Sequence, residues 1–289
     1  MTNDNHIDNE IYDRLGDTWW GEDNPLNVLQ GSFTPGRLGY FRGVLERTGR
    51  DPAGLRALDV GCGGGFLAEE FAKLGCQVVG VDPSRVSIAT AQRHATLSGL
   101  KIEYVVASGE CLPLETAFFD LAYCCDVLEH VADVDLVIRE SARVLKPGGL
   151  YLFDTINRTA VSHLFAISLL QKWRLTRVID TDLHNWDMFI TPSELGAHLR
   201  RHRLNLDEVV GLGPRASMAS LLRYYVQQRR GRITFGELSR RMNVGQVDRT
   251  DISYMGYATK ANATGTDSGT AADLSTATAT DTTSAPAPS

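Results

Sequence analysis

Two carboxylates and an imidazole stand close together in the stretch "CCDVLEHV", as Asp126, Glu129 and His130. Such a set can hold a divalent cation such as magnesium or zinc, and a histidine can also act alone as a general base near neutral pH. Two further interpretations remain open. Glu129 and His130 can cap the helix that follows, where a carboxylate is favourable, or they can orient a substrate.

A second chemical feature is the turn "GCGGG", which contains Gly61 and Gly63 and lies between two apolar runs. A strand that enters such a turn before a helix N-terminus offers free backbone N–H groups to a ligand. A dinucleotide fingerprint needs a third glycine where Phe66 stands, and no Lys-Ser/Thr pair follows to make a phosphate loop. Asp59 before the turn and Asp82 at the end of the next run suit a ligand with a ribose and a positive charge. The alternative is a plain strand–helix turn.

The elements that must position these residues alternate from residue 56 onward. Apolar runs predict five strands, at 57–60, 77–82, 101–107, 118–126 and 150–156. Helical stretches are predicted between them at 65–75, 83–99 and 131–145. This alternation predicts an α/β, Rossmann-like fold whose parallel sheet is covered by helices on both faces. Runs at 205–212 and 251–260 bring the expected mostly parallel sheet to seven strands.

Segments around this core set the expected domain organisation. Residues 1–55 predict a helical N-terminal extension that serves as a lid. Residues 56–260 form the main domain, with insertions at about 158–192 and 213–250. Residues 261–289 are almost all small or polar, so we expect them to be a disordered tail.

Composition excludes several classes of protein. The formal net charge of −6 argues against a nucleic-acid partner. We find no apolar run long enough for a transmembrane helix and no secretory signal. The five cysteines lack metal-type CxxC spacing. Together these features predict a reduced, cytoplasmic protein.

The motifs "LDVGCGGG", "GVD", "VLEHV" and "VLKPGG" resemble those of the class I S-adenosylmethionine (SAM)-dependent methyltransferases. More closely, residues 11–260 are similar to the 3-demethylubiquinol 3-O-methyltransferases of ubiquinone biosynthesis, through "DTWW", "PGRLGYF", "TINR", "FITPSEL" and "DISYMGYA". The resemblance implies SAM as cofactor and a small aromatic molecule as methyl acceptor. It places the cofactor against Arg37, Gly61, Asp82, Ser108, Glu110 and Cys125, to which the turn adds Asp59 and Gly63.

The resemblance also bears on "CCDVLEHV", because the family is associated with dependence on a divalent metal. Asp126, Glu129 and His130 would then hold a cation that acidifies a catechol hydroxyl. Without a metal, His130 is the expected general base, with Glu129 beside it. Three further residues are implied to flank the acceptor: Asn157, Arg158 and His184.

The apolar segment 161–177 predicts either a helix at a membrane interface, and so a peripheral membrane contact, or a lid helix. Trp19 and Trp20 are expected to pack rather than react. The alternatives in function are a C- or N-methyltransferase of a small metabolite, an NAD-dependent oxidoreductase, and a SAM-binding protein without turnover. The oligomeric state is left open.

Overall fold

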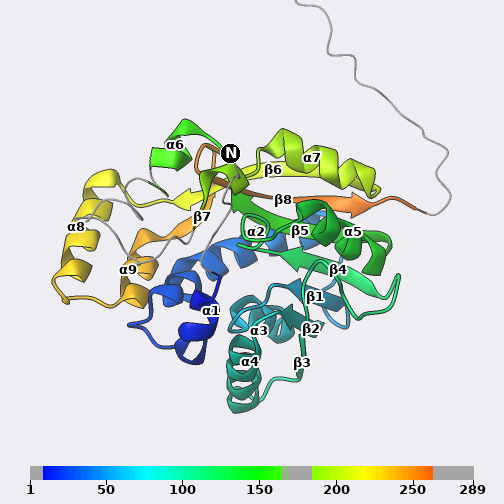
Figure 1. The fold of residues 1–289 in the computed structure, drawn as a ribbon, viewed down its shortest axis with the longest axis horizontal. Helices are drawn as coiled ribbons and strands as arrows, with labels where there is room; N and C mark the ends of the chain where they lie inside the picture. The colour runs from blue at the N-terminus through cyan, green and yellow to red at the C-terminus, as the bar shows by residue number, and fades with distance from the viewer. Residues whose placement is uncertain (1–8, 165–166, 168–183, 263–289) are drawn as a thin grey trace, which may run out of the picture.

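The computed structural model describes residues 9–164, 167 and 184–262. Figure 1 shows a twisted sheet with helices on both faces. The predicted tail beyond residue 262 and most of the apolar segment 161–177 lie outside the described residues. Within the described ranges, no helix is both long enough and apolar enough to cross a membrane.

The predicted Rossmann-like α/β architecture is confirmed, but the count of seven strands is wrong. In the described residues the sheet has eight strands, in the order β3-β2-β1-β4-β5-β8-β6-β7. Their bounds are β1 Arg56–Val60, β2 Gln77–Asp82, β3 Ile102–Val106, β4 Phe119–Cys124, β5 Leu145–Ile156, β6 Leu204–Pro214, β7 Val244–Val247 and β8 Ser253–Lys260. Strands β1 to β5 pair in parallel, and β8, β6 and β7 add antiparallel. The unpredicted strand is β7, a short segment inside the expected insertion 213–250 that pairs with the end of β6.

Strand β5 begins earlier than the predicted range 150–156. The stretch "KPGG" does not form a loop after the helix, because the chain enters the strand directly at Leu145. Leu145 pairs with Phe119, and after a register shift Leu150 pairs with Leu121. Gly148 has a φ of +73°, which lets the surplus residues bulge out of the ladder.

The helices cover the two faces of the sheet as the alternation predicts. Their bounds are α1 Ile11–Arg14, α2 Thr34–Arg47, α3 Phe66–Lys73, α4 Arg85–Leu97, α5 Val134–Val144, α6 Ala160–Ser162, α7 Pro192–Arg201, α8 Met218–Arg229 and α9 Phe235–Met242. Phe41 of α2 and Phe71 of α3 pack in the core on one face. Ile138 of α5 and Leu199 of α7 pack in the core on the other. Since parallel strands end at one edge, the loops after β1, β2, β3 and β4 meet there.

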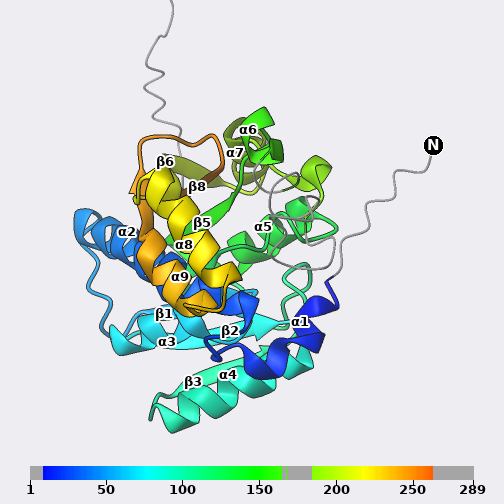
Figure 2. The ribbon, with the colours of Figure 1, turned by 90° about the vertical axis from the view of Figure 1, so that its left-hand side faces the viewer.

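The N-terminal extension and the insertion pack against each other although they lie far apart in the sequence (Figure 2). The Ser239 hydroxyl of α9 donates to the Val28 carbonyl at 2.5 Å and lies 3.0 Å from the Ser32 hydroxyl. Strand β7 passes so close to α2 that a Cβ added at Gly36 would lie 2.3 Å from the Val244 carbonyl oxygen. The insertion therefore supports α2, the helix that carries Arg37.

Alanine at Gly36 is expected to lower the free energy of unfolding by about 1–3 kcal/mol, because its methyl group has no room beside Val244. Gly39 is the matched control in the same helix, since a Cβ added there meets nothing within 4 Å. Gly39→Ala is expected to be neutral or to stabilise by up to about 1 kcal/mol through helix propensity. Denaturant unfolding measures both, and equal changes would contradict this account of the packing.

Candidate active site

The glycine turn after β1 is tied to the end of β2. The backbone N–H groups of Gly61 and Cys62 donate to the Val81 carbonyl at 2.7 and 3.0 Å. Gly61 has a φ of +76°, and a Cβ there would lie 2.3 Å from a methyl carbon of Val127 in the loop after β4. Glycine is required at this position because the two loops meet without space for a side chain. Asp59 is 3% exposed, and burial, aided by nearby Asp82, raises its pKa well above the usual range.

Asp82 links the turn to the two loops beside it. Its carboxylate accepts hydrogen bonds from Gly63 N and Ser84 N, each at 2.9 Å. Its carbonyl accepts from Ala107 N at 3.1 Å, which brings the loop after β3 alongside. In that loop, the Ser108 hydroxyl donates to Glu110 at 3.1 Å. Asp82 therefore lies next to the glycine turn, and the loop that carries Ser108 and Glu110 begins beside Asp82.

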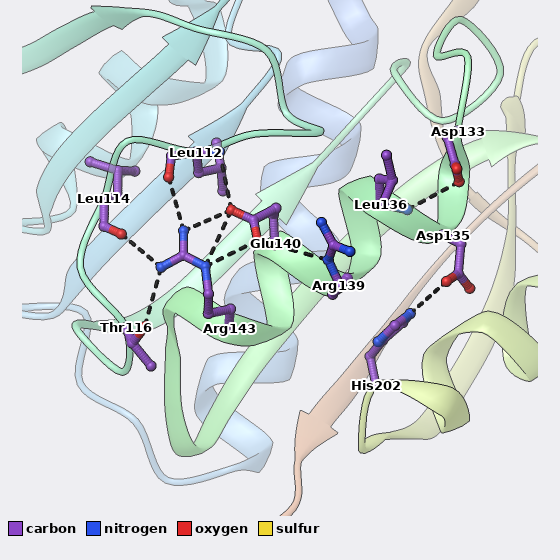
Figure 3. A network of polar contacts seen from close by, with 10 residues as sticks. All are labelled: Leu112, Leu114, Thr116, Asp133, Asp135, Leu136, Arg139, Glu140, Arg143 and His202. Carbon is purple, nitrogen blue, oxygen red and sulfur yellow. Dashed lines mark hydrogen bonds and ion pairs between the residues drawn. The ribbon is translucent and has the colours of Figure 1, made fainter.

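Helix α5 holds the loop after β3 in place (Figure 3). Arg143 donates to the carbonyls of Leu112 and Leu114 at 2.9 and 2.8 Å, and pairs with Glu140 at 2.7 Å. At the start of the helix, Glu110 accepts a hydrogen bond from Asp133 N at 3.0 Å. In the first turn of α5, Asp135 pairs with His202, the residue that follows α7 (Figure 3). Contacts with α5 thus hold the loop that carries Ser108 in place.

Two tryptophans of the extension cover the glycine turn. Trp19 is 3% exposed, and its indole N–H donates to the Ser87 hydroxyl at 2.9 Å. A Cβ added at Gly64 would lie 2.5 Å from the Trp19 side chain, so the indole rests directly on the turn. The Trp20 indole N–H donates to the Gly64 carbonyl at 2.9 Å, and its ring stacks on His94 with centroids 3.4 Å apart.

Tyr12 joins this cover to the loop after β4. Its ring stacks on Trp19 with centroids 6.1 Å apart and meets His130 edge-on at 6.0 Å. Burial, together with the carboxylates of Asp126, Glu129 and Asp82, raises the pKa of its hydroxyl above the ordinary value. Tyr12 therefore lies among the predicted cofactor and catalytic groups. No spacing in the sequence points to it, because its place depends on the path of the extension.

Arg37 reaches the same edge from α2. Its side chain is 4% exposed and pairs with Asp126, which follows β4, and with Asp154 near the end of β5. Asp126 has a φ of +54°, a backbone conformation that residues other than glycine rarely adopt. Cys125 is partly buried, and burial, with Asp154 nearby, raises the pKa of its thiol. Asp154 escaped prediction, although a carboxylate inside the apolar run "LYLFDTI" is a visible signal.

The loop after β4 carries Glu129 and His130. Glu129 is 1% exposed and accepts a hydrogen bond from the Thr155 hydroxyl at 2.8 Å, while burial raises its pKa. The Nδ1 atom of His130 is buried and has no hydrogen-bond partner among the described residues. The His184 ring lies 5.1 Å from that of His130. Burial lowers the pKa of His130 to about 4 and that of His184 to about 3, so both imidazoles are neutral at pH 7.

The geometry does not fit the predicted metal site. Asp126 is paired with Arg37, and Glu129 is turned toward Thr155. Within the described ranges, no group of three or more His, Cys, Asp or Glu side chains is placed to hold a metal ion. The three residue types are suitable ligands, but their present partners keep them from converging on one point.

The remaining predicted acceptor residues hold neighbouring loops. The Asn157 side chain donates to the Thr250 carbonyl at 2.8 Å, and Arg158 pairs with Glu194 at the start of α7. His184 is therefore the one of these three that the structure brings into ring contact with His130. A surface hollow at the opposite edge of the sheet, by the amino ends of β1 to β3, is lined by residues such as Arg56 and Lys101. It lies away from the predicted site.

The fold and the glycine-turn edge are those of a Rossmann-like methyltransferase. A family model described as a methyltransferase domain matches residues 58–153. The chain belongs to the class I SAM-dependent methyltransferases, and within them to the family of the ubiquinone biosynthesis O-methyltransferases. It is thus an enzyme that uses SAM as its methyl donor.

Curated relatives carry this assignment to the family. The chain is 36% identical over 247 residues to the ubiquinone biosynthesis O-methyltransferase of Xanthomonas axonopodis pv. citri, covering 85% of this chain and 90% of the relative. It is 37% identical over 208 residues to that of Azorhizobium caulinodans, covering 70% and 81%.

Solved structures support the fold alone. A SAM-dependent methyltransferase from Thermotoga maritima, described as a possible histamine N-methyltransferase, matches with a TM-score of 0.55 at 18% identity, over 87% of this chain and 99% of that one. The magnesium protoporphyrin IX methyltransferase of Synechocystis, with bound S-adenosylhomocysteine, matches with a TM-score of 0.52 at 16% identity, over 78% and 82%.

Proposed function

We propose that the protein transfers a methyl group from SAM to a phenol or catechol hydroxyl of a quinone-pathway intermediate or a related aromatic metabolite. The observation that carries this proposal is His130, a neutral imidazole with an unpartnered Nδ1 at the edge of the sheet where the glycine turn and Asp82 lie. The names of the curated relatives point to the same chemistry.

The reaction needs a base more than it needs covalent help. Methyl transfer is an in-line displacement, so the enzyme holds the acceptor oxygen behind the methyl carbon. A phenolic hydroxyl has a pKa near 10 and must lose its proton to become a good nucleophile. In our proposal the proton passes to His130 as the oxygen–carbon bond forms and the sulfur–carbon bond breaks, which leaves S-adenosylhomocysteine. Glu129 lies beside His130 as the predicted second group.

Aromatic side chains around His130 suit a flat acceptor. Tyr12 meets the imidazole edge-on at 6.0 Å, and the His184 ring lies 5.1 Å away. Phe189, 1% exposed, lies 5.9 Å beyond His184. Rings placed edge-on or offset around a planar substrate contribute roughly 0.5–1.5 kcal/mol per pair beyond the area they bury.

We propose that the donor lies between the glycine turn and the loop after β3. Gly61 and Gly63 would face its amino-acid end, with Asp59 behind them, and Asp82 would bind the ribose hydroxyls. Ser108, Glu110 and Cys125 would flank the adenine. Hydrogen bonds link Gly63 to Asp82 and Asp82 to Ala107, so the loops after β1, β2 and β3 lie side by side in this order. This arrangement supports the proposed placement of the amino-acid end, the ribose and the adenine.

Incubation with labelled SAM and a panel of catechols, phenols and hydroquinones tests the proposal. We expect label on an acceptor oxygen. Label on carbon or nitrogen would replace it with the C- or N-methyltransferase alternative, and no label on any acceptor would favour a binding protein. Parallel incubations with EDTA test the metal: a loss of turnover that magnesium or zinc restores would return a cation to Asp126, Glu129 and His130.

Calorimetric titration with SAM, S-adenosylhomocysteine and NAD separates the remaining alternative. We expect both sulfur ligands to bind and NAD to give no heat beyond dilution. Phe66 is the first residue of α3, in the position where a dinucleotide fingerprint needs its third glycine. Tight binding of NAD would overturn the proposal.

A further inference from the structure

A buried cluster of one cation and two carboxylates lies at the carboxyl ends of β4 and β5. The Arg37 guanidinium donates through Nη2 to Asp154 Oδ1 at 3.1 Å, and its Nε lies 2.5 Å from Asp154 Oδ2. Arg37 Nη2 also donates to Asp126 Oδ2. The side chains of Arg37 and Asp154 are 4% and 1% exposed, whereas that of Asp126 is 28% exposed. The two carboxylates therefore hold the same arginine from different environments.

Asp154 is the fixed partner of the two. It belongs to β5, where its backbone pairs with Met255 of β8. Besides Arg37, its Oδ1 atom accepts a hydrogen bond from Asp126 N at 3.1 Å. Asp154 thus holds both the guanidinium of Arg37 and the backbone of Asp126, the other carboxylate that binds this arginine.

Asp126 is the partner that can be exchanged. Its side chain is the more exposed of the two, and the hydrogen bond that its carboxylate makes is to Arg37. Its charge contributes to the raised pKa values of Tyr12 and Glu129, so it lies close to both. Its backbone is in the strained left-handed region.

The cluster carries more negative than positive charge. One guanidinium faces two carboxylates, and Glu129 lies near enough for the Asp126 and Asp154 charges to raise its pKa. This surplus favours a positive group beside Asp126, the more exposed of the two carboxylates, because the protein interior screens charge poorly. The amino-acid end of SAM is a zwitterion, with one carboxylate and one ammonium. It supplies one partner for Arg37 and one for Asp126.

We propose that Asp154 is a positioning residue which keeps Arg37 aimed at the cofactor, while Asp126 exchanges its partner when the cofactor binds. The cofactor carboxylate takes the place of Asp126 on Arg37, and the cofactor ammonium takes the place of Arg37 on Asp126. Each charged group keeps an opposite charge beside it, the net charge of the cluster does not change because the amino-acid end is neutral overall, and Asp154 holds the arginine throughout. The inference rests on the expected contact between Arg37 and SAM, and it assigns that contact to the amino-acid end of the cofactor.

Two ligands that differ only in the amino-acid end test the role of Asp154. S-Adenosylhomocysteine has that end, and 5′-methylthioadenosine lacks it. Asp154→Asn is expected to weaken the binding of S-adenosylhomocysteine by about tenfold or more, the size expected for a hydrogen bond to a charged group. The affinity for 5′-methylthioadenosine should be unchanged. Calorimetry on the full chain measures both constants.

The matched control is Asp120→Asn. Asp120 is an aspartate of β4 that pairs with Lys146 at 2.6 Å, toward the other end of the strand. The Asp120→Asn variant should bind both ligands as the parent protein does. Equal losses of both ligands in Asp154→Asn would indicate a structural role alone and overturn the proposal, as would unchanged affinity for S-adenosylhomocysteine. Because no acceptor is present, these outcomes are independent of whether the O-methylation proposal holds.

A third ligand tests the exchange at Asp126. The desamino analogue of S-adenosylhomocysteine keeps the carboxylate but has no ammonium. It must break the Arg37–Asp126 pair without replacing it, so Asp126→Asn is expected to bind this analogue as well as or better than the parent does. The same variant is expected to lose about tenfold for S-adenosylhomocysteine, whose ammonium has lost its partner. Equal weakening of both ligands would refute the exchange.

Discussion

His130→Ala is expected to lower kcat toward a phenolic acceptor by about 10²- to 10⁴-fold, the range for loss of a general base. The KM for SAM should change little, because our proposal places His130, which is in ring contact with His184 and Tyr12, beside the methyl acceptor. The matched control is His202→Ala. Its partner Asp135 keeps contacts with His198 and Arg201, so turnover should stay within about threefold, the scale of a surface ion pair.

The pH profile gives the same prediction a second readout. Burial lowers the pKa of His130 to about 4, so the imidazole is unprotonated and able to accept a proton above that value. Glu129 and Asp154, whose pKa values burial raises to about 8 and about 6, titrate in the same range. The readout is therefore the ratio of kcat/KM between the parent and His130→Ala, which we expect to stay level as pH falls from about 8 to about 5 and to drop only as pH passes through about 4. A midpoint near 6.5, the value of an unperturbed histidine, would contradict the buried environment. Full turnover by His130→Ala would contradict the role itself.

Asp82→Ala is expected to weaken S-adenosylhomocysteine binding by roughly 10²- to 10⁴-fold. Two hydrogen bonds from ribose hydroxyls to a charged group are lost, at about 1.5–3 kcal/mol each. The change also frees Gly63 N and Ser84 N, which Asp82 holds at 2.9 Å, so the glycine turn itself loosens. Calorimetric titration at fixed salt measures the constants.

Asp82→Asn separates these two causes. The amide keeps one acceptor oxygen and the shape of the side chain, so we expect a smaller loss, of about tenfold. Binding of S-adenosylhomocysteine by Asp82→Ala within a few-fold of the parent would show that the ribose lies elsewhere. Denaturant unfolding of both variants identifies any loss that comes from misfolding.

Sequence reasoning reached the parts of the site that depend on local chain geometry. The glycine turn, Asp82 and the loop after β4 each follow a strand, and the ends of parallel strands share one edge of a sheet. Their meeting could therefore be predicted without any tertiary contact. The buried strands β1 to β5 could also be predicted locally, because a run of apolar residues is visible in the sequence itself. The short β7 was not predicted, because its four residues form a strand only through pairing with the end of β6.

The parts that escaped prediction depend on contacts across the fold. Asp154 acquires its role only when α2 brings Arg37 to the end of β5. Tyr12 reaches His130 only because the extension crosses the site. The predicted metal ligands do not converge in the structure for a similar reason: their residue types suit a cation, but Asp126 pairs with Arg37 and Glu129 accepts a hydrogen bond from Thr155, and both partners come from other elements. Local spacing carries no information about such partners.

The contact between the extension and the insertion has a consequence for the order of folding during synthesis. The extension leaves the ribosome first, yet Gly31 and Gly36 fit against Ser239 and Val244, which are made near the end. Contacts between distant parts of a chain form late because a long loop must close first. The support of α2, the helix that carries Arg37, is therefore completed among the last parts of the nascent chain, and a chain that stops before residue 239 would lack both this support and β8, the strand that joins β5 to β6.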